Sequence, residues 1–297
     1  GKRVARRRAD YWESATPETF NRLIVSACAL GGGGKTEFGA HAGQRDSPLV
    51  YLSIDPNNRA VVAKVMAETQ REIILKEFRK LPMTISGRND SVQDLAKEQW
   101  DNFCEANERI VQGDSPLGDP EDSRNRGTVV WDTATEFFDL AFIAEFGRTN
   151  QIQWYQRAPV NKVYADMIDA YRATPFNLVL LHRLKKQYAE QTKTVRGRRG
   201  EETKTEREWT GAFEREGYNK MEFLIDTEVH LTKDLDVAVE TDADVGDRFG
   251  MSVVKCTTRP FIEGKAWVGR TKRGTSKASF AWLAFQVYPD TTVQEWK

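Results

Sequence analysis

This chain of 297 residues contains 39% apolar and 30% charged residues, and its 44 Lys and Arg residues equal its 44 Asp and Glu residues in number. Length and composition indicate a globular protein with a sizeable core, and the balanced charge excludes a general attraction to polyanions. Three cysteines, Cys28, Cys104 and Cys256, are too few and too widely spaced for a disulfide framework or a zinc-finger pattern. Since no apolar run is long enough to cross a bilayer, we expect a cytoplasmic protein without a membrane partner.

Residues 1–20 are predicted to form a basic N-terminal arm, with Lys2, Arg3 and three consecutive arginines at positions 6–8. Asp10 and Glu13 follow these residues, so the segment lacks the apolar stretch of a secretory signal. The arm is expected either to be solvated or to contact a polyanion.

Apolar runs that alternate with helix-favouring segments predict an α/β protein. Strands with nearly continuous apolar sequence indicate a parallel sheet that is buried on both faces. The predicted strands are residues 23–30, 49–54, 128–131 and 177–181, and the predicted helices are residues 59–80 and 92–111. Further strands are expected at residues 223–231, 251–256 and 279–287, either antiparallel to the sheet or as a small lid, and a charged loop at residues 188–208.

A run of glycines follows the first predicted strand and leads into a helix-compatible segment. Without a Cβ, such residues allow backbone N–H groups to surround a phosphate. Lys35 would contact the β- and γ-phosphates of ATP, and Thr36 would hold Mg²⁺ through its hydroxyl. Ala29 occupies the position where the usual pattern has a first glycine, which is acceptable if this residue needs no positive φ. The predicted nucleotide-binding residues are Gly31, Gly32, Gly33, Gly34, Lys35 and Thr36.

Polar residues that follow the other strands are candidates for the same edge of the sheet. Asp132, directly after the strand at 128–131, would hold Mg²⁺ together with Thr36. A carboxylate that activates water could be Asp55 or Glu136, although one of them could simply cap a helix and the other be a solvated acid. His182, after the strand at 177–181, would either contact the γ-phosphate or be exposed at the surface.

Two segments are candidates for contacts with unpaired nucleic acid. The segment at 183–199 carries seven basic residues against one acid, and the segment at 147–162 combines aromatic rings with arginines, a combination that suits base stacking. The aromatic residues could equally belong to the core or to a subunit contact. The predicted DNA-binding residues are Arg148, Trp154, Tyr155, Arg157, Lys185, Lys186, Arg196, Arg198 and Arg199.

Near the C-terminus, Lys255 and Arg259 lie at the tip of the strand at 251–256. Cations at such a strand end could either stabilise charge on the nucleotide of a neighbouring subunit or be solvated.

These motifs together resemble RecA-fold ATPases, and most of all the short phage-encoded RecA-like ATPases that accompany single-strand annealing or recombination genes. The resemblance covers residues 20–265 and implies a RecA-like P-loop NTPase fold, with a mostly parallel central sheet, flanking helices and antiparallel C-terminal strands. It implies a core at residues 21–265 and a C-terminal strand extension at residues 266–297. It also implies DNA-dependent ATP hydrolysis with Mg²⁺, a homo-oligomeric filament or ring on single-stranded DNA, a single-stranded-DNA-binding protein as a further partner, and the host-cell cytoplasm as the location.

Three features depart from the RecA pattern, and one is that only Lys255 lines up with the paired lysines of RecA, since Arg259 is displaced. Asn57 stands where that pattern has the water-activating glutamate, which implies slow hydrolysis or the use of Asp55 or Glu136. His182 stands where RecA itself has glutamine. The alternatives are a ring-forming DNA motor, such as a helicase or packaging ATPase, and a nucleotide-gated assembly protein with little turnover.

Overall fold

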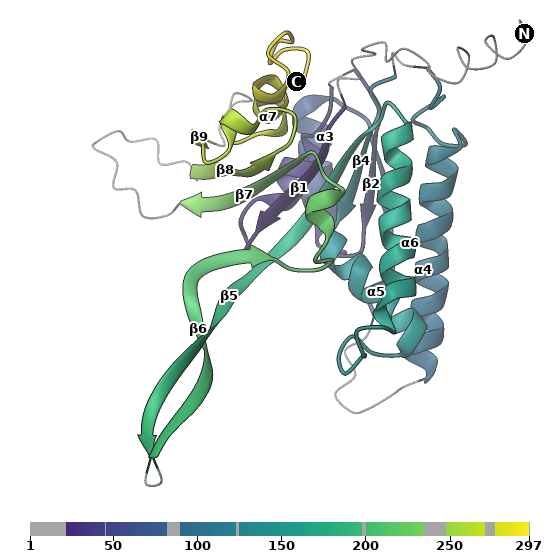
Figure 1. Ribbon diagram of the computed structural model, residues 1–297. Coiled ribbons are helices and arrows are strands. Elements are labelled where there is room, and N and C mark those ends of the chain that lie inside the picture. Colours follow the sequence, from purple (N-terminus) through teal and green to yellow (C-terminus); the bar gives the residue numbers. More distant parts are fainter. Residues whose placement is uncertain are drawn as a thin grey trace, which may run out of the picture.

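One central sheet, with helices on both faces, organises the chain (Figure 1). The computed structural model describes residues 22–44, 46–81, 90–122, 125–197, 200–234, 248–270 and 277–296, so the predicted arm at residues 1–20 lies outside the described residues. The described strands are β1 (Ile24–Ala29), β2 (Leu49–Ser53), β3 (Ile73–Glu77), β4 (Thr128–Asp132), β5 (Asn177–Gly197), β6 (Gly200–Arg215), β7 (Thr227–Asp234), β8 (Arg248–Cys256) and β9 (Ala266–Arg270). The helices are α2 (Lys35–Ala40), α3 (Asn58–Thr69), α4 (Asp90–Val111), α5 (Ala134–Phe146), α6 (Arg157–Ala170) and α7 (Phe280–Val287).

The strand order is β3-β2-β4-β5-β1-β7-β8-β9, with β6 paired to the far part of β5. Strands β1 to β5 and β7 are parallel, whereas β8 and β9 are antiparallel to their neighbours. This arrangement confirms the predicted α/β architecture with a mostly parallel sheet and antiparallel strands near the C-terminus. The strand expected at 223–231 is β7, which is parallel to β1 and not antiparallel as predicted. All residues of β1, β2 and β4 are buried, as expected for strands covered on both faces.

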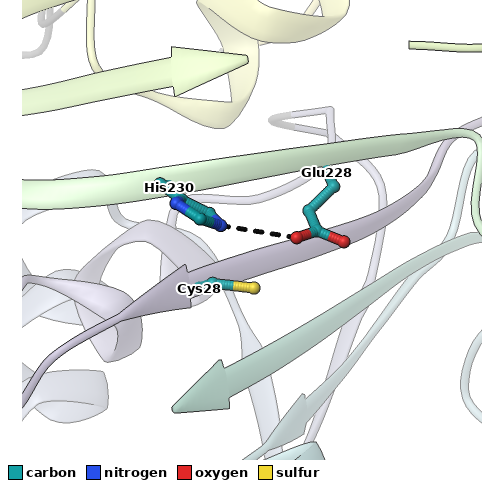
Figure 2. Close-up of side chains that lie close together, drawn as sticks. All are labelled: Cys28, Glu228 and His230. Carbon is teal, nitrogen blue, oxygen red and sulfur yellow. Dashed lines mark hydrogen bonds and ion pairs between the residues drawn. The ribbon is translucent and has the colours of Figure 1, made fainter. Parts of the chain in front are cut away.

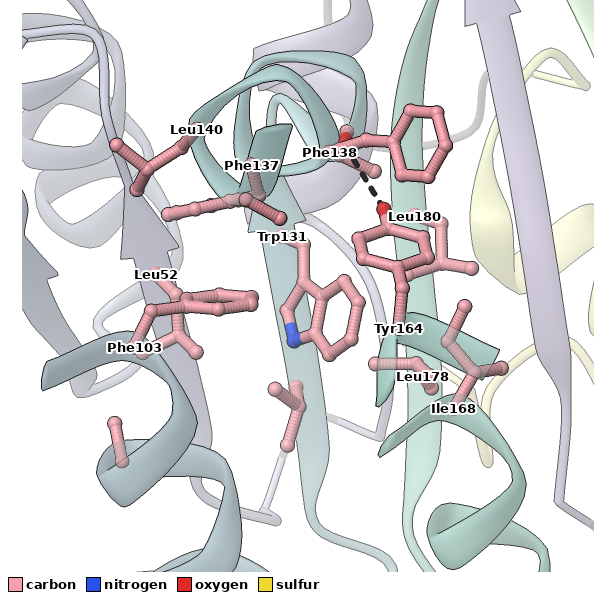
Figure 3. Packing of buried hydrophobic residues seen from close by; sticks show 14 of the residues in the cluster. Leu52, Phe103, Trp131, Phe137, Phe138, Leu140, Tyr164, Ile168, Leu178 and Leu180 are labelled. Atoms are coloured by element: carbon pink, nitrogen blue, oxygen red, sulfur yellow. Dashed lines mark hydrogen bonds between the residues drawn. The ribbon is translucent and has the colours of Figure 1, made fainter. Parts of the chain in front are cut away.

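Two apolar clusters fill the space between the sheet and its helices. Helices α4, α5 and α6 cover one face, where Trp131 of β4 contacts Phe103 of α4 and Tyr164 of α6 (Figure 3). Helices α2, α3 and α7 contribute to the cluster on the other face, which includes Phe38 and Phe280. None of the helices in the described ranges has both the length and the apolar character needed to cross a membrane.

Three predicted elements were wrong, and two of them are the helix at 59–80 and the strand at 279–287. The segment at 59–80 is not one helix, since α3 ends at Thr69 and the chain forms edge strand β3, where Ile73 is buried. The segment at 279–287 is helix α7 rather than a strand, so the C-terminal extension is not made of strands alone. The side chain of Ser279 accepts a hydrogen bond from the backbone N of Trp282 and caps this helix, and residues spaced three and four apart, such as Phe280 and Leu283, are buried.

The charged segment at 188–208 is not a loop but belongs to a long β-hairpin formed by β5 and β6. In Figure 1 this hairpin extends well beyond the sheet. Opposite charges face each other across it, for example Glu190 and Arg207, whose side chains lie 3.3 Å apart. The charged composition predicted a loop, but cross-strand pairs of this kind stabilise an exposed hairpin.

Candidate functional site

The glycine turn connects β1 to α2 at the carboxyl edge of the parallel sheet. The backbone N of Gly33 donates to the carbonyl of Leu30 at 3.1 Å, and Gly32 and Gly34 have φ values of 75° and 80°. A Cβ on Gly33 would lie 2.6 Å from the Cβ of Ala29, which is too close for any side chain. Ala29 ends β1 and has no positive φ, so alanine satisfies the backbone there.

Lys35 lies across this turn. Its Nζ donates to the carbonyls of Ala29 at 3.2 Å and Leu30 at 3.3 Å. Burial lowers the pKa of Lys35, while the nearby Asp132 carboxylate opposes this effect. A partly desolvated ammonium held by two neutral carbonyls would gain from an anionic partner, because hydrogen bonds between charged groups are the stronger ones.

Thr36 and Asp132, the two predicted magnesium ligands, are in direct contact. The Thr36 hydroxyl donates to Oδ2 of Asp132 at 2.8 Å. The two residues meet although β5 lies between β1, which precedes Thr36, and β4, which ends at Asp132. Tyr51 donates to the same oxygen at 2.5 Å, and Thr36 also lies 3.1 Å from Oδ1 of Asn58. Burial raises the pKa of Asp132. Hydroxyl, carboxylate and amide oxygens are suitable ligands for Mg²⁺, so the donors present fit this ion.

The two candidate water-activating carboxylates have different surroundings. Asp55 Oδ1 accepts hydrogen bonds from the backbone N and the side-chain Nδ2 of Asn57 at 3.0 and 2.9 Å, at the start of α3. Glu136 is mostly buried in the first turn of α5, where its Oε1 is paired with Arg183 and lies 3.6 Å from Nζ of Lys80. Its Oε2 has no hydrogen-bond partner among the described residues. This oxygen is buried, so the described residues show a carboxylate oxygen without a partner but no path for water to it.

His182 is neither at a strand end nor at the surface, because β5 continues through it and its side chain is fully buried. Its Nδ1 lies 3.0 Å from the Ser26 hydroxyl. Burial, together with the nearby Arg215 guanidinium, lowers the pKa of His182 to about 3. The next residue, Arg183, is aligned with Ala29 on β1 and is partly exposed, so it lies closer to the position expected for a phosphate contact.

The buried His182 predicts a pH dependence of stability. The folded pKa of about 3 is below the ordinary value of 6.5, so between these pH values the unfolded chain binds a proton that the folded chain does not. Stability from this residue is therefore present above pH 6.5 and is lost as the pH falls, by up to about 1.4 kcal/mol per pH unit. Denaturant unfolding at pH 7 and pH 5 should show a smaller loss in His182→Gln than in the wild type. Equal losses would assign the pH dependence to groups other than His182.

The predicted stacking residues lie in and after the connection between α5 and α6. Trp154 and Tyr155 are 82% and 60% exposed, and their ring centroids are 6.0 Å apart. Arg148 is also exposed, whereas the segment at 147–162 is not wholly a loop, because α6 begins at Arg157. The Arg157 guanidinium lies over the ring of Phe142 at 5.7 Å. Exposure of both rings excludes the core alternative for Trp154 and Tyr155.

The predicted basic residues of the second segment lie on the β5–β6 hairpin. Lys185 is 3.4 Å from Glu214, and Nζ of Lys186 is 5.0 Å from the ring centroid of Trp209. Arg196 is aligned with Glu201, and Arg198 and Arg199 lie outside the described residues. Lys185 and Lys186 therefore contact side chains of β6, and Arg196 is in register with a β6 residue.

Lys255 and Arg259 lie at the end of β8 that is level with the start of β1, away from the glycine turn. Lys255 donates to the carbonyl of Glu222, and Arg259 donates to the carbonyl of Gln286 at 2.6 Å. Their position excludes contact with the phosphate site of their own chain.

Several neighbours of these sites were not recognised from the sequence. Tyr51 and Asn58 contact the magnesium-ligand pair, but a buried tyrosine in a strand and an asparagine in a helix carry no motif. A separate group of exposed aromatic residues, Tyr188, Trp209 and Phe213, lies on the hairpin. The sequence could have indicated them only through the alternation of side chains along a strand. This chain matches no model of a known protein family and no curated protein.

Proposed function

We propose that this chain is an ATP- and Mg²⁺-dependent, RecA-like ATPase that acts on single-stranded DNA in recombination or annealing. The observation that carries the proposal is the contact between Thr36 and Asp132 at 2.8 Å, beside a glycine turn spanned by Lys35. When bound, Mg²⁺ would neutralise charge on the β- and γ-phosphates. A cation, backbone N–H groups and two oxygen ligands at one sheet edge suit a magnesium nucleotide better than an uncharged ligand.

Within this proposal, Arg183 takes the phosphate contact first expected of His182. Arg183 is aligned with the residue that begins the glycine turn, and its charge acts on Lys35. It is paired with Glu136 and leads directly into the hairpin. A γ-phosphate would compete with Glu136 for the Arg183 guanidinium. Binding or loss of this phosphate would therefore change the contacts of a β5 residue that leads into the hairpin.

The DNA partner is proposed from the exposed rings at the α5–α6 connection. Replacing Trp154 and Tyr155 with alanine should weaken single-stranded DNA binding by about 1–3 kcal/mol per stacked base. Fluorescence anisotropy with labelled oligonucleotides would measure the change. Phe261→Ala is the matched control, since this ring is 62% exposed but lies beyond the end of β8, away from the glycine turn. Unchanged DNA affinity in the double variant would assign the rings to protein contacts.

The proposal also includes a homo-oligomer with the nucleotide between subunits. Lys255 and Arg259 cannot reach the glycine turn of their own chain, so a role in ATP chemistry would require a neighbouring copy. Each now contacts a backbone carbonyl of its own chain, and these contacts would have to be exchanged for phosphate oxygens on assembly.

A nucleotide-gated assembly protein with little turnover is the second candidate. It is favoured by Asn57 at the position of the expected glutamate and by the engagement of Asp55 with this asparagine. ATP turnover with and without single-stranded DNA separates the two candidates. DNA-stimulated turnover supports the ATPase, whereas ATP-dependent assembly without turnover supports the gated protein. If ATP causes no turnover and no assembly, both candidates are contradicted.

A further inference from the structure

Three potential metal ligands meet on the face of the sheet beside the start of the glycine turn. Cys28 lies on β1, and Glu228 and His230 lie on the adjacent strand β7 (Figure 2). Their Sγ, carboxylate oxygen and imidazole nitrogen all lie within 4.8 Å of one another. Sulfur, nitrogen and oxygen donors together suit zinc, whereas Mg²⁺ prefers oxygen alone.

Neighbouring groups hold these ligands as the outer shell of a metal site would. Oε2 of Glu228 accepts from Nε of Arg215 at 3.2 Å, which leaves Oε1 directed to Nε2 of His230 at 3.4 Å. The Ser26 hydroxyl lies 3.4 Å from Sγ of Cys28 and 3.0 Å from Nδ1 of His182. Carboxylates and thiolates that bind metals are commonly oriented by second hydrogen bonds of this kind.

A second imidazole lies in the same row of the sheet. Cys28 is aligned with His230 on one side and with His182 on the other. The Nε2 of His182 is buried and has no hydrogen-bond partner among the described residues. A buried polar atom without a partner is unfavourable, and it points to a group that the protein alone does not supply.

We propose that Cys28, Glu228 and His230 bind one zinc ion that joins β1 to β7 next to the glycine turn. Tetrahedral zinc places its ligand atoms roughly 3.3–3.8 Å apart, so no pair of these ligand atoms needs to approach by more than about 1.5 Å. His230 is 20% exposed at its side chain, which gives the ion access from solvent, and water would complete the four ligands.

Charge and protons balance in this site. Burial, and then the Glu228 carboxylate, raises the pKa of Cys28 to about 12, so the residue is a thiol before the ion binds. Zinc displaces the thiol proton, which leaves to solvent, and forms the sulfur–zinc bond. The thiolate and the carboxylate then supply two negative charges to the ion, while Arg215 stays paired with the other carboxylate oxygen of Glu228. The site is independent of the proposed ATPase function.

Cobalt(II) is the probe for this proposal, because a cobalt–thiolate bond gives charge-transfer absorption that oxygen ligands do not. Titration of the metal-free full chain should give one cobalt per chain with this absorption, and zinc should displace it. Cys28→Ser should abolish the absorption, whereas Cys104→Ser, on α4, should retain it. Lys35→Ala should also retain it, which separates this site from nucleotide binding.

Two further variants keep the test decisive if Cys28→Ser does not fold. His230→Ala removes a partly exposed ligand, and Ser26→Ala removes the hydroxyl beside the sulfur and should weaken cobalt binding by about 10–100-fold. The proposal is overturned if the wild type shows no sulfur-to-cobalt absorption, if that absorption survives in Cys28→Ser, or if His230→Ala binds cobalt as the wild type does.

Discussion

Lys35→Ala is expected to weaken ATP binding by at least about 100-fold. In the structure, the ammonium spans the glycine turn and donates to the carbonyls of Ala29 and Leu30, so bound phosphates could accept both hydrogen bonds instead. Two charge-assisted hydrogen bonds of about 1.5–3 kcal/mol each correspond to a loss of this size or more. Fluorescence anisotropy with a labelled ATP analogue would measure it.

The control for this variant is Lys64→Ala, which removes the same charge from the surface of α3, where Lys64 lies 3.8 Å from Glu68. This variant should bind ATP as the wild type does, and circular dichroism should show that both variants are folded. If Lys35→Ala binds ATP with unchanged affinity, the glycine turn is not the phosphate site.

Trp131→Ala is expected to lower the free energy of unfolding by about 3–5 kcal/mol, because a large side chain would be lost from the core and leave a cavity. Trp131 is fully buried between the sheet and α4, α5 and α6, with its ring centroid 4.9 Å from that of Phe103 (Figure 3). Its Nε1 donates to Oδ1 of Asn107 at 3.0 Å, and this bond would also be lost. Chemical denaturation at neutral pH would measure the change.

Trp154→Ala is the matched control for this core variant. The Trp154 side chain is 82% exposed, so its loss should change stability by less than about 0.5 kcal/mol. Because Asp132 directly follows Trp131, the core variant should also weaken Mg²⁺-dependent ATP binding. Equal stabilities for the two alanine variants would contradict the packing in Figure 3.

The elements predicted correctly are those whose signals are local in the sequence. Continuous apolar runs identified β1, β2 and β4, and the glycine run with Lys35 and Thr36 placed the turn at the end of β1. Since parallel strands share one carboxyl edge, Asp132 could be placed near that turn. The pairing of Asp132 with Thr36 was also predicted, but the neighbours Tyr51 and Asn58 were not, because only the folded sheet brings them to this pair.

The elements predicted wrongly have signals that depend on distant partners. A short apolar run is compatible with either a helix or a strand, so the assignment of α7 required its packing against Phe38. The β5–β6 hairpin is stabilised by cross-strand pairs such as Lys185 with Glu214, which no periodicity within one strand reveals. The proposed zinc ligands could not be predicted from the sequence for the same reason, because Cys28 lies close to Glu228 and His230 of β7, which are about 200 positions away in the chain.

Equilibrium dialysis of the full chain against labelled ATP, with Mg²⁺ and with a chelator, tests the central claim most directly. The geometry at Thr36 and Asp132 predicts one ATP per chain, at least about tenfold tighter with Mg²⁺, a difference that Asp132→Asn should remove. No retained ATP, or the same affinity with and without Mg²⁺, would contradict a magnesium nucleotide site at this edge of the sheet.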